Sequence, residues 1–316
     1  MKKLIIIAVA LVLVGAVVCG ASAAAMGFDF TKLDNGKYET NTYAVKEDFR
    51  SIAIDATVEK ITFMPSGDKS CKVVCYEEER MKHSVAVTDG TLTVKAQDGR
   101  KLADRFLFNL KNPEITVYLP DRAYSELGIE TDTGDVEIPA DFSFDAITIK
   151  GDTADVDCFA SAKSGAAIAL TTGDIHVADI RTGALELKTT TGRINAEAVD
   201  CAGDLLVRVD TGKTYLRDVK CRNLTSEGTT GDITMDNVVA ADTIDVSRDT
   251  GDVEFSAGDA ETILVKTSTG DVTGTLRSEK VFLTETETGR VEVPKSISGG
   301  RCEIYTDTGD IKIEVP

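Results

Sequence analysis

Aspartates recur at a fixed interval along most of the chain, and their carboxylates could hold a metal ion. They follow a Thr-Gly pair in most copies of a short motif, and Asp232, Asp252 and Asp271 are three successive examples. Hard cations such as Ca²⁺ prefer carboxylate oxygens, so stacking of these copies would create a candidate calcium site. The alternative is that each aspartate hydrogen-bonds nearby backbone and shapes the turn. The Gly-Gly-x-Gly-x-Asp repeat of calcium-bound solenoids is not present, which favours the turn-shaping role.

Cysteines are the second set of reactive side chains, and six of the seven lie after residue 28. Cys201 and Cys221 occupy equivalent positions of consecutive copies, so stacking would bring them within reach of a disulfide. A bridge and two free thiols both remain open. Cys71 and Cys75 are four residues apart on an expected strand, about 13 Å, which is too far to bridge each other.

Catalytic residues are hard to assemble from this sequence. His83 and His176 are the two histidines, and neither has a partner nearby in sequence that indicates a triad. We therefore expect no enzyme activity and no cofactor. The alternative is an extracellular carbohydrate-active β-helix enzyme, which would need exposed aromatic residues to hold sugar. The pattern instead predicts interior positions for Tyr215, Phe255 and Phe282.

A repeat of nineteen or twenty residues positions all of these groups. The residue before the repeated glycine is threonine in all ten copies, and the residue two after it is valine or isoleucine in nine. The glycine position falls at Gly134, Ala154, Gly173, Gly192, Gly212, Gly231, Gly251, Gly270, Gly289 and Gly309. Glycine suits a corner because it accepts a positive φ, so the corner at Ala154 should be strained or differently shaped.

Apolar residues alternate on both sides of each Thr-Gly corner, as expected for strands with one buried face. Ile147 and Ile149 illustrate the pair before the corner, and Ile138 and Val177 illustrate the position after it. Because the same residue type returns at a constant interval, the pattern favours stacked coils in which equivalent residues lie on one another. We therefore predict an all-β chain, a single-chain parallel β-solenoid of about ten 19–20-residue coils. An antiparallel sandwich of hairpins is the structural alternative.

The expected organisation has three parts. Residues 1–28 form an export segment, 29–125 a β-rich N-terminal cap with degenerate coils, and 126–316 the solenoid repeats. A cap is expected because terminal repeats must cover an open apolar end. The C-terminal run 311–316 has no evident cap, and we expect Lys312, Glu314 and Pro316 to blunt that edge.

The first residues indicate export. Met1-Lys2-Lys3 precedes 25 uncharged residues, 4–28, and positive charge before an apolar run orients the N-terminus inside. Small residues at 21–25 fit a cleavage site, whereas the same run is long enough for a retained anchor, which needs about 20 residues. Lipidation of Cys19 is a third route that Val18 disfavours. Each route places the remaining chain outside the cytoplasm, secreted or at the bacterial cell surface.

Charge limits the partners of the chain. The formal net charge is −18, from 53 acidic and 35 basic residues, and such a field repels phosphate backbones. We expect no nucleic acid partner, and contact with a membrane only through the N-terminal segment. The expected partner is a cell-surface or envelope protein or glycan.

The run Ile129-Glu-Thr-Asp-Thr-Gly-Asp-Val136, its repeats, and Ile115-Thr-Val-Tyr-Leu-Pro120 before them resemble a bacterial putative-adhesin family of unknown function with β-strand repeats. The resemblance covers most of the chain after the export segment. It implies a surface-located β-helical protein with roles in adhesion or envelope stress, and it brings no functional residues with it. Together these observations predict an exported structural or interaction module without catalytic activity.

Overall fold

The computed structural model describes residues 2–25, 27–28, 37–98 and 111–316. The one helix among them is α1 (Lys2–Ala25), and all other regular elements are strands. Within these residues no helix has the combined length and apolar character that crossing a bilayer requires.

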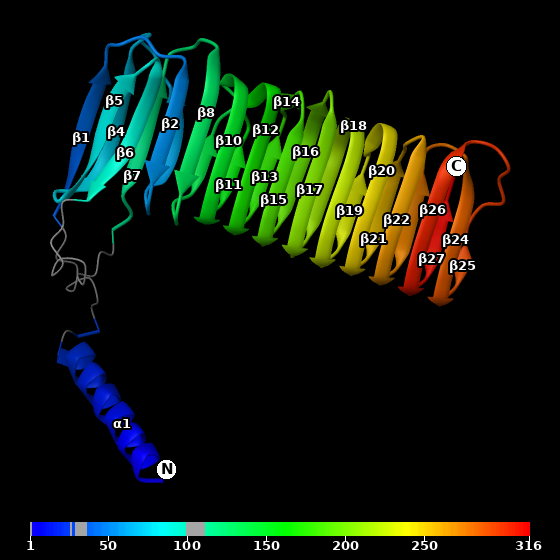
Figure 1. Cartoon of the computed structure of the whole chain (residues 1–316), viewed down its shortest axis with the longest axis horizontal. Helices are drawn as coiled ribbons and strands as arrows, with labels where there is room; N and C mark the ends of the chain where they lie inside the picture. Colours follow the sequence, from blue (N-terminus) through cyan, green and yellow to red (C-terminus); the bar gives the residue numbers. More distant parts are fainter. Residues whose placement is uncertain (1, 26, 29–36, 99–110) are drawn as a thin grey trace.

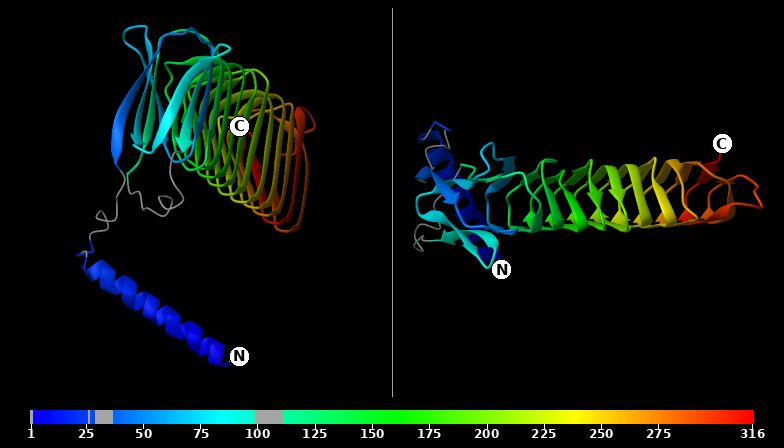
Figure 2. Two further views of the ribbon diagram at one scale, coloured as in Figure 1. Left: turned by 60° about the vertical axis from the view of Figure 1, so that its left-hand side comes forward. Right: turned by 90° about the horizontal axis from the view of Figure 1, so that it is seen from above.

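The repeats form a parallel β-solenoid of about nine turns with two long faces, which confirms the predicted fold (Figures 1 and 2). The strands of the first face are β8 (Tyr124–Thr131), β10 (Ser143–Thr153), β12 (Ser161–Thr172), β15 (Leu185–Thr191), β17 (Asp204–Thr211), β20 (Val239–Thr250), β22 (Thr262–Thr269), β24 (Lys280–Thr288) and β26 (Gly300–Thr308). Those of the second face are β9 (Val136–Ile138), β11 (Val156–Cys158), β13 (Ile175–Ala178), β16 (Ile194–Cys201), β19 (Ile233–Asp236), β21 (Val253–Gly258), β23 (Val272–Leu276), β25 (Val291–Glu292) and β27 (Ile311–Glu314). The long strand β18 (Thr214–Thr230) belongs to both faces, and β14 (Arg181–Thr182) lies between them.

In-register pairing turns each repeat position into a column that runs up the solenoid. Ile149 pairs with Ile168, and Ile168 in turn pairs with Leu187. All three side chains are completely buried. The interior therefore consists of stacked aliphatic side chains from both faces, as the alternation in the sequence predicts.

The Thr-Gly corner requires glycine for two reasons. Gly192 has a φ of 152°, a backbone conformation that other residues rarely adopt. A Cβ at this position would also lie 2.0 Å from the carbonyl oxygen of Gly173, the equivalent corner residue of the preceding coil. Ala154 does not have a positive φ, so its corner is shaped differently, as expected.

Replacing Gly192 by alanine should lower the free energy of unfolding by about 1–3 kcal/mol or more, because it combines a disfavoured φ with an inter-coil clash. Chemical denaturation monitored by circular dichroism would measure the loss. Gly128→Ala is the matched control, since its Cβ would make an ordinary 3.9 Å contact with the Ile52 carbonyl oxygen and its φ is not positive. Equal destabilisation by both variants would contradict the corner argument.

The N-terminal strands continue both faces and then change direction. They are β1 (Tyr38–Val45), β2 (Ser51–Ala56), β3 (Lys60–Pro65), β4 (Cys71–Glu78), β5 (Met81–Thr88), β6 (Thr91–Asp98) and β7 (Glu114–Leu119). Strands β2 and β3 pair in parallel with β8 and β9, so they extend the solenoid upstream of the first repeat. Antiparallel pairs β1–β4, β4–β7 and β5–β6 follow beyond them. The boundaries at residues 28 and 125 stay predictions.

The last two coils do not stack in chain order. Strand β26 pairs with β22 on one side and with β24 on the other, and β27 likewise lies between β23 and β25. The coil of β24 and β25 comes first in the sequence and lies outermost. The coil of β26 and β27 follows it in the sequence but lies one layer further inside (Figure 1). The expectation that residues 311–316 form the blunted edge is therefore wrong, because β27 has a neighbour on each side.

The true edge is the coil of β24 and β25, and it exposes apolar side chains. Val281, Leu283 and Val291 are each about half exposed, and Ile297 in the connection to β26 is 98% exposed. In a coil with a neighbour above it, part of this surface would be covered.

Engineered cysteine pairs can verify this order. Thr262 and Val281 each pair with Arg301, from opposite sides. Disulfides should therefore form in Thr262→Cys/Arg301→Cys and in Val281→Cys/Arg301→Cys. Thr262→Cys/Val281→Cys should stay reduced, because two strand spacings, about 9.6 Å, exceed disulfide reach. Mass spectrometry of non-reduced peptides would detect the bridges, and a 262–281 bridge would show stacking in chain order instead.

Candidate functional site

A buried group of ionisable side chains lies at the N-terminal end of the solenoid. We call it the His83 cluster, and it consists of Glu59, Cys75, Glu77 and His83. Cys75 and Glu77 point to the same side of β4, His83 lies on β5, and Glu59 directly precedes β3. The side chains of His83, Glu59 and Glu77 are at most 1% exposed. A thiol, a carboxylate and an imidazole nitrogen, from Cys75, Glu77 and His83, lie within 4.8 Å of one another.

Glu77 makes a full set of hydrogen bonds. Its Oε2 accepts from the backbone N–H of His83 at 2.6 Å and contacts His83 Nδ1 at 2.5 Å. Its Oε1 accepts from Asn41 Nδ2 at 2.7 Å and from the Tyr43 hydroxyl at 2.8 Å. Groups from β1 and β5 thus converge on this carboxylate, which fixes the His83 ring.

Glu59 is held by one oxygen only. Its Oε2 accepts from the backbone N–H groups of Thr57 and Val58 at 2.7 and 3.0 Å. Its Oε1 and the Nε2 atom of His83 are both buried without a hydrogen-bond partner, 3.5 Å from each other. Buried polar atoms are normally satisfied, so this pair is an exception that needs a physical reason.

The cluster strongly favours a positive charge at the imidazole. Burial alone would lower the pKa of His83, but contacts with Cys75, Glu59 and Glu77 outweigh it and raise the pKa to about 10. Burial likewise acts to raise the pKa of Glu59, and the nearby His83 together with the backbone N–H groups that bond Oε2 instead lowers it to about 2. Burial raises the pKa of the Cys75 thiol. A cation at the centre therefore offsets the desolvation of two carboxylates.

No pattern in the sequence points to this cluster, because its members come from three separate segments that share no repeat. The other histidine, His176, lies on the outer surface, with Nδ1 3.3 Å from Asp157 Oδ1. It is half exposed and stacks edge-on against Phe159.

The repeated aspartates form a ladder of hydrogen bonds between coils. Asp232 Oδ1 accepts from the backbone N–H of Asp252 at 3.1 Å, and Asp252 Oδ1 accepts from that of Asp271 at 2.9 Å. Asp271 continues the ladder to Asp310, thirty-nine residues later, because the final coil is inserted there. The carboxylates thus bond backbone as the turn-shaping alternative proposed, although across coils and not within one turn. Calcium binding at Asp232, Asp252 and Asp271 stays a prediction.

Asp252→Ala should lower the free energy of unfolding by about 0.5 kcal/mol, the low end for a hydrogen bond, since water can replace the exposed carboxylate. Asp252→Asn keeps the accepting oxygen and should cost less. Urea denaturation measures both. A calorimetric titration with Ca²⁺ separates the two roles, because a calcium site requires heat of binding below millimolar concentration that disappears in Asp252→Asn.

The structure places Cys201 and Cys221 at equivalent positions of neighbouring strands, since Asp200 pairs with Lys220 just before them. Both are buried and free. The disulfide therefore stays a prediction, with the required proximity in place.

Among the three aromatic residues predicted to be interior, Tyr215 lies on the surface. Phe255 is buried and Phe282 is partly buried against the core, but Tyr215 is 39% exposed. Thr214 and Leu216 on either side of it are buried, so alternation points Tyr215 outward. The prediction of an interior Tyr215 is wrong, because the residue lies between two inward-pointing positions of its strand.

The fold defines a parallel β-solenoid with a mixed β-sheet region at its N-terminal end. Residues 49–314 match the family model described as Toastrack DUF4097, and the chain belongs to this family. The family resemblance inferred from the sequence is thereby confirmed.

Several solved structures are similar to this chain. A putative adhesin from Parabacteroides distasonis is 14% identical, with 89% of this chain and 98% of that chain covered and a TM-score of 0.49. A putative lipid binding protein from the same organism is 17% identical (76% and 95% covered, TM-score 0.45). A putative adhesin from Bacteroides fragilis is also 17% identical (88% and 97% covered, TM-score 0.40). Among curated proteins no match was found.

Proposed function

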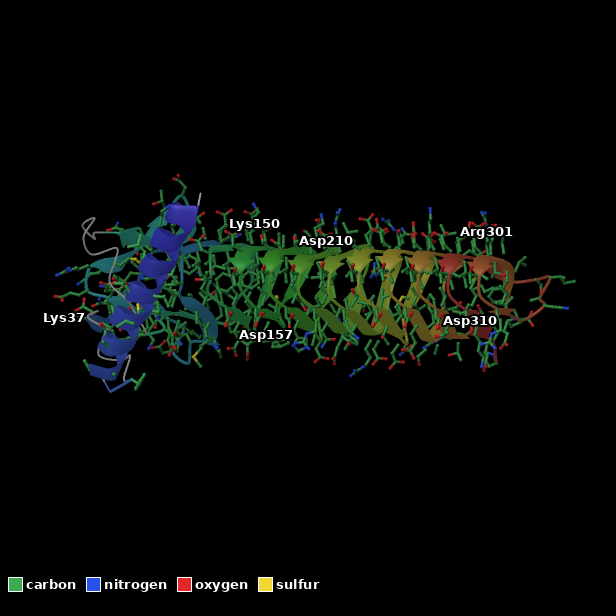
Figure 3. All side chains as sticks on the ribbon, turned by 90° about the horizontal axis from the view of Figure 1, so that it is seen from below. Lys37, Lys150, Asp157, Asp210, Arg301 and Asp310 are labelled. Atoms are coloured by element: carbon green, nitrogen blue, oxygen red, sulfur yellow. The ribbon has the colours of Figure 1, made fainter. Side chains whose placement is uncertain are left out.

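We propose that this chain is an exported structural or interaction module, adhesin-like or envelope-associated, that acts outside the bacterial membrane without catalysing a reaction. The observation that carries this proposal is the regularity of its two long faces. Polar side chains project from both of them at the strand spacing, with Lys150, Asp210 and Arg301 on one side and Asp157 and Asp310 on the other (Figure 3).

Charges on the first face are paired across coils. One outward column begins with Glu130 and Lys150, whose charged groups are 3.5 Å apart. Further along, Arg208 contacts Glu227 of the next coil and Asp210 of its own. Such pairs contribute little to stability at an exposed surface. They instead give the face a mixed pattern of positive and negative charge that a polar protein or glycan partner could match.

The depressions on this surface are shallow and polar. One of about 410 Å³ lies at the junction of the N-terminal region and the first coils, lined by Asp55, Glu130, Lys150 and Asp152 among others. Extended contact with a cell-surface or envelope protein or glycan suits such a surface better than enclosure of a small apolar ligand. The net charge of −18 supports a partner other than nucleic acid.

Export can be tested with the full-length chain carrying a C-terminal epitope tag in a bacterial host. We expect protease added to intact cells to remove the tag, because the N-terminal segment carries the remaining chain out. The same chain without residues 1–28 should stay protected until the cells are lysed. Protection of both forms would contradict the proposed location.

The interaction role is tested with purified protein and isolated cell envelopes. The chain should sediment with envelopes, and reversing charges on the face that binds should reduce this. Lys188→Glu/Arg208→Glu alters the first face, and Arg217→Glu/Lys312→Glu alters the second, so each is a control for the other. Unchanged sedimentation of both would argue against binding by the polar faces. Release of new sugar ends from an acidic polysaccharide would replace the proposal by the carbohydrate-active enzyme.

A further inference from the structure

We propose that the His83 cluster binds a divalent metal ion of the zinc type, with Cys75, His83 and Glu59 as ligands and Glu77 as the carboxylate that orients His83. The proposal concerns the N-terminal end of the solenoid and is independent of the outer faces. It rests on the donor set, on the distance between His83 Nε2 and Glu59 Oε1, and on the lack of a hydrogen bond at these two buried atoms.

The donor set is one that d-block ions prefer. Zn²⁺ is bound in proteins by cysteine thiolate, histidine nitrogen and carboxylate oxygen, usually four together. Cys75 and His83 supply the first two, at a site from which water is excluded. Alkaline-earth ions, which take six or more oxygens, fit this mixed set poorly.

The distances separate ligands from supporting groups. Two ligands bound to one tetrahedral Zn²⁺ at 2.0–2.2 Å are about 3.4 Å apart. His83 Nε2 and Glu59 Oε1, 3.5 Å apart, match that separation. The same distance is longer than the 2.7–3.2 Å of an ordinary N–H···O hydrogen bond. A direct imidazolium–carboxylate bond would bring the two atoms closer.

Glu77, unlike Glu59, has the geometry of a supporting residue and not of a metal ligand. Its Oε2 is 2.5 Å from His83 Nδ1, which is too short for two ligands of one ion and normal for a strong hydrogen bond. Each of its oxygens already has two polar contacts. Histidines that bind metals commonly donate their other N–H to a carboxylate, which fixes the tautomer and leaves Nε2 free for the ion. Glu77 therefore acts as a positioning residue.

Charge is compatible with metal binding. Two buried carboxylates and a thiol surround a single imidazole, and a proton on that imidazole leaves the group with one net negative charge. Zn²⁺ bound by neutral His83 and the Cys75 thiolate, with both of their protons released, leaves the same net charge. The cluster can therefore exchange its protons for a metal ion without burying additional charge.

The site would join three separate segments. Glu59 precedes β3, and a Cβ on Gly134 in the first coil would lie 1.8 Å from the Glu59 carbonyl oxygen, so Glu59 belongs to the stacked corners. Cys75 and His83 belong to the antiparallel strands beyond them. A metal ion here would fasten those strands to the end of the solenoid, and metal binding should raise the melting temperature.

The experiment uses the full-length protein purified in detergent after expression with added Zn²⁺. Elemental analysis should find one Zn²⁺ per chain, and removal by a chelator should lower the melting temperature. Replacement by Co²⁺ should give visible absorption bands and a thiolate-to-cobalt charge-transfer band in the near ultraviolet. Absence of bound metal, together with no thermal shift on adding Zn²⁺ or Co²⁺, would leave the cluster as a buried ion network and overturn the proposal.

Two cysteines on β4 provide a matched pair of variants. Cys75→Ser should abolish the charge-transfer band, whereas Cys71→Ser, which is also buried on the same strand, should retain it. Glu77→Gln should keep the band but weaken affinity by about 10–100-fold, as loss of an orienting carboxylate does. A band that survives in Cys75→Ser, or disappears in Cys71→Ser, would place the ion elsewhere. If Cys75→Ser fails to fold, the cobalt spectra of the unmodified protein and of Cys71→Ser decide the question.

Discussion

In-register hydrogen bonding between parallel coils is the constraint on which the rest of this structure depends. The backbone N–H of Gly192 bonds the carbonyl of Thr211, and that of Gly173 bonds Thr191 in the same way one coil earlier. Every position therefore meets its own equivalent at the strand spacing. A side chain is acceptable only if it can lie beside a copy of its own position, which is why apolar residues, threonines and glycines return at each repeat.

The same constraint explains the departures from the repeat. Arg248 points into the interior at a position held elsewhere by small or aliphatic residues, and it is only 3% exposed. Gly228 pairs with it in the coil before, where an added Cβ would lie 3.0 Å from the guanidinium. Ser226 accepts a hydrogen bond from the same group. The large side chain of Arg248 is thus accommodated because its neighbour in the preceding coil is a glycine. Burial lowers the pKa of Arg248 to about 10.

The solenoid could be predicted from the sequence because the regular spacing of the Thr-Gly corners indicates that the repeats stack. It could not reach the order of the last coils, since the interval between Gly289 and Gly309 equals others in the chain. A constant spacing between repeats does not show which coil lies next to which in space. The His83 cluster was inaccessible for a related reason, because antiparallel pairing in residues 38–98 brings together side chains that share no periodic position. Tyr215 is different, since its alternation with Thr214 and Leu216 was sufficient to place it outside.

The inserted final coil also determines how such a rod can change length during evolution. A solenoid whose last residues form its outer layer lengthens by duplicating its final repeat, because each new copy finds an open edge. Here the coil of β26 and β27 is already occupied on both sides, by β22 and β23 on one and by β24 and β25 on the other. A copy of this repeat placed directly after it would start one layer inside the rod and meet no open edge. Duplication of an earlier repeat would instead lengthen the rod and leave these two interleaved coils together as one unit.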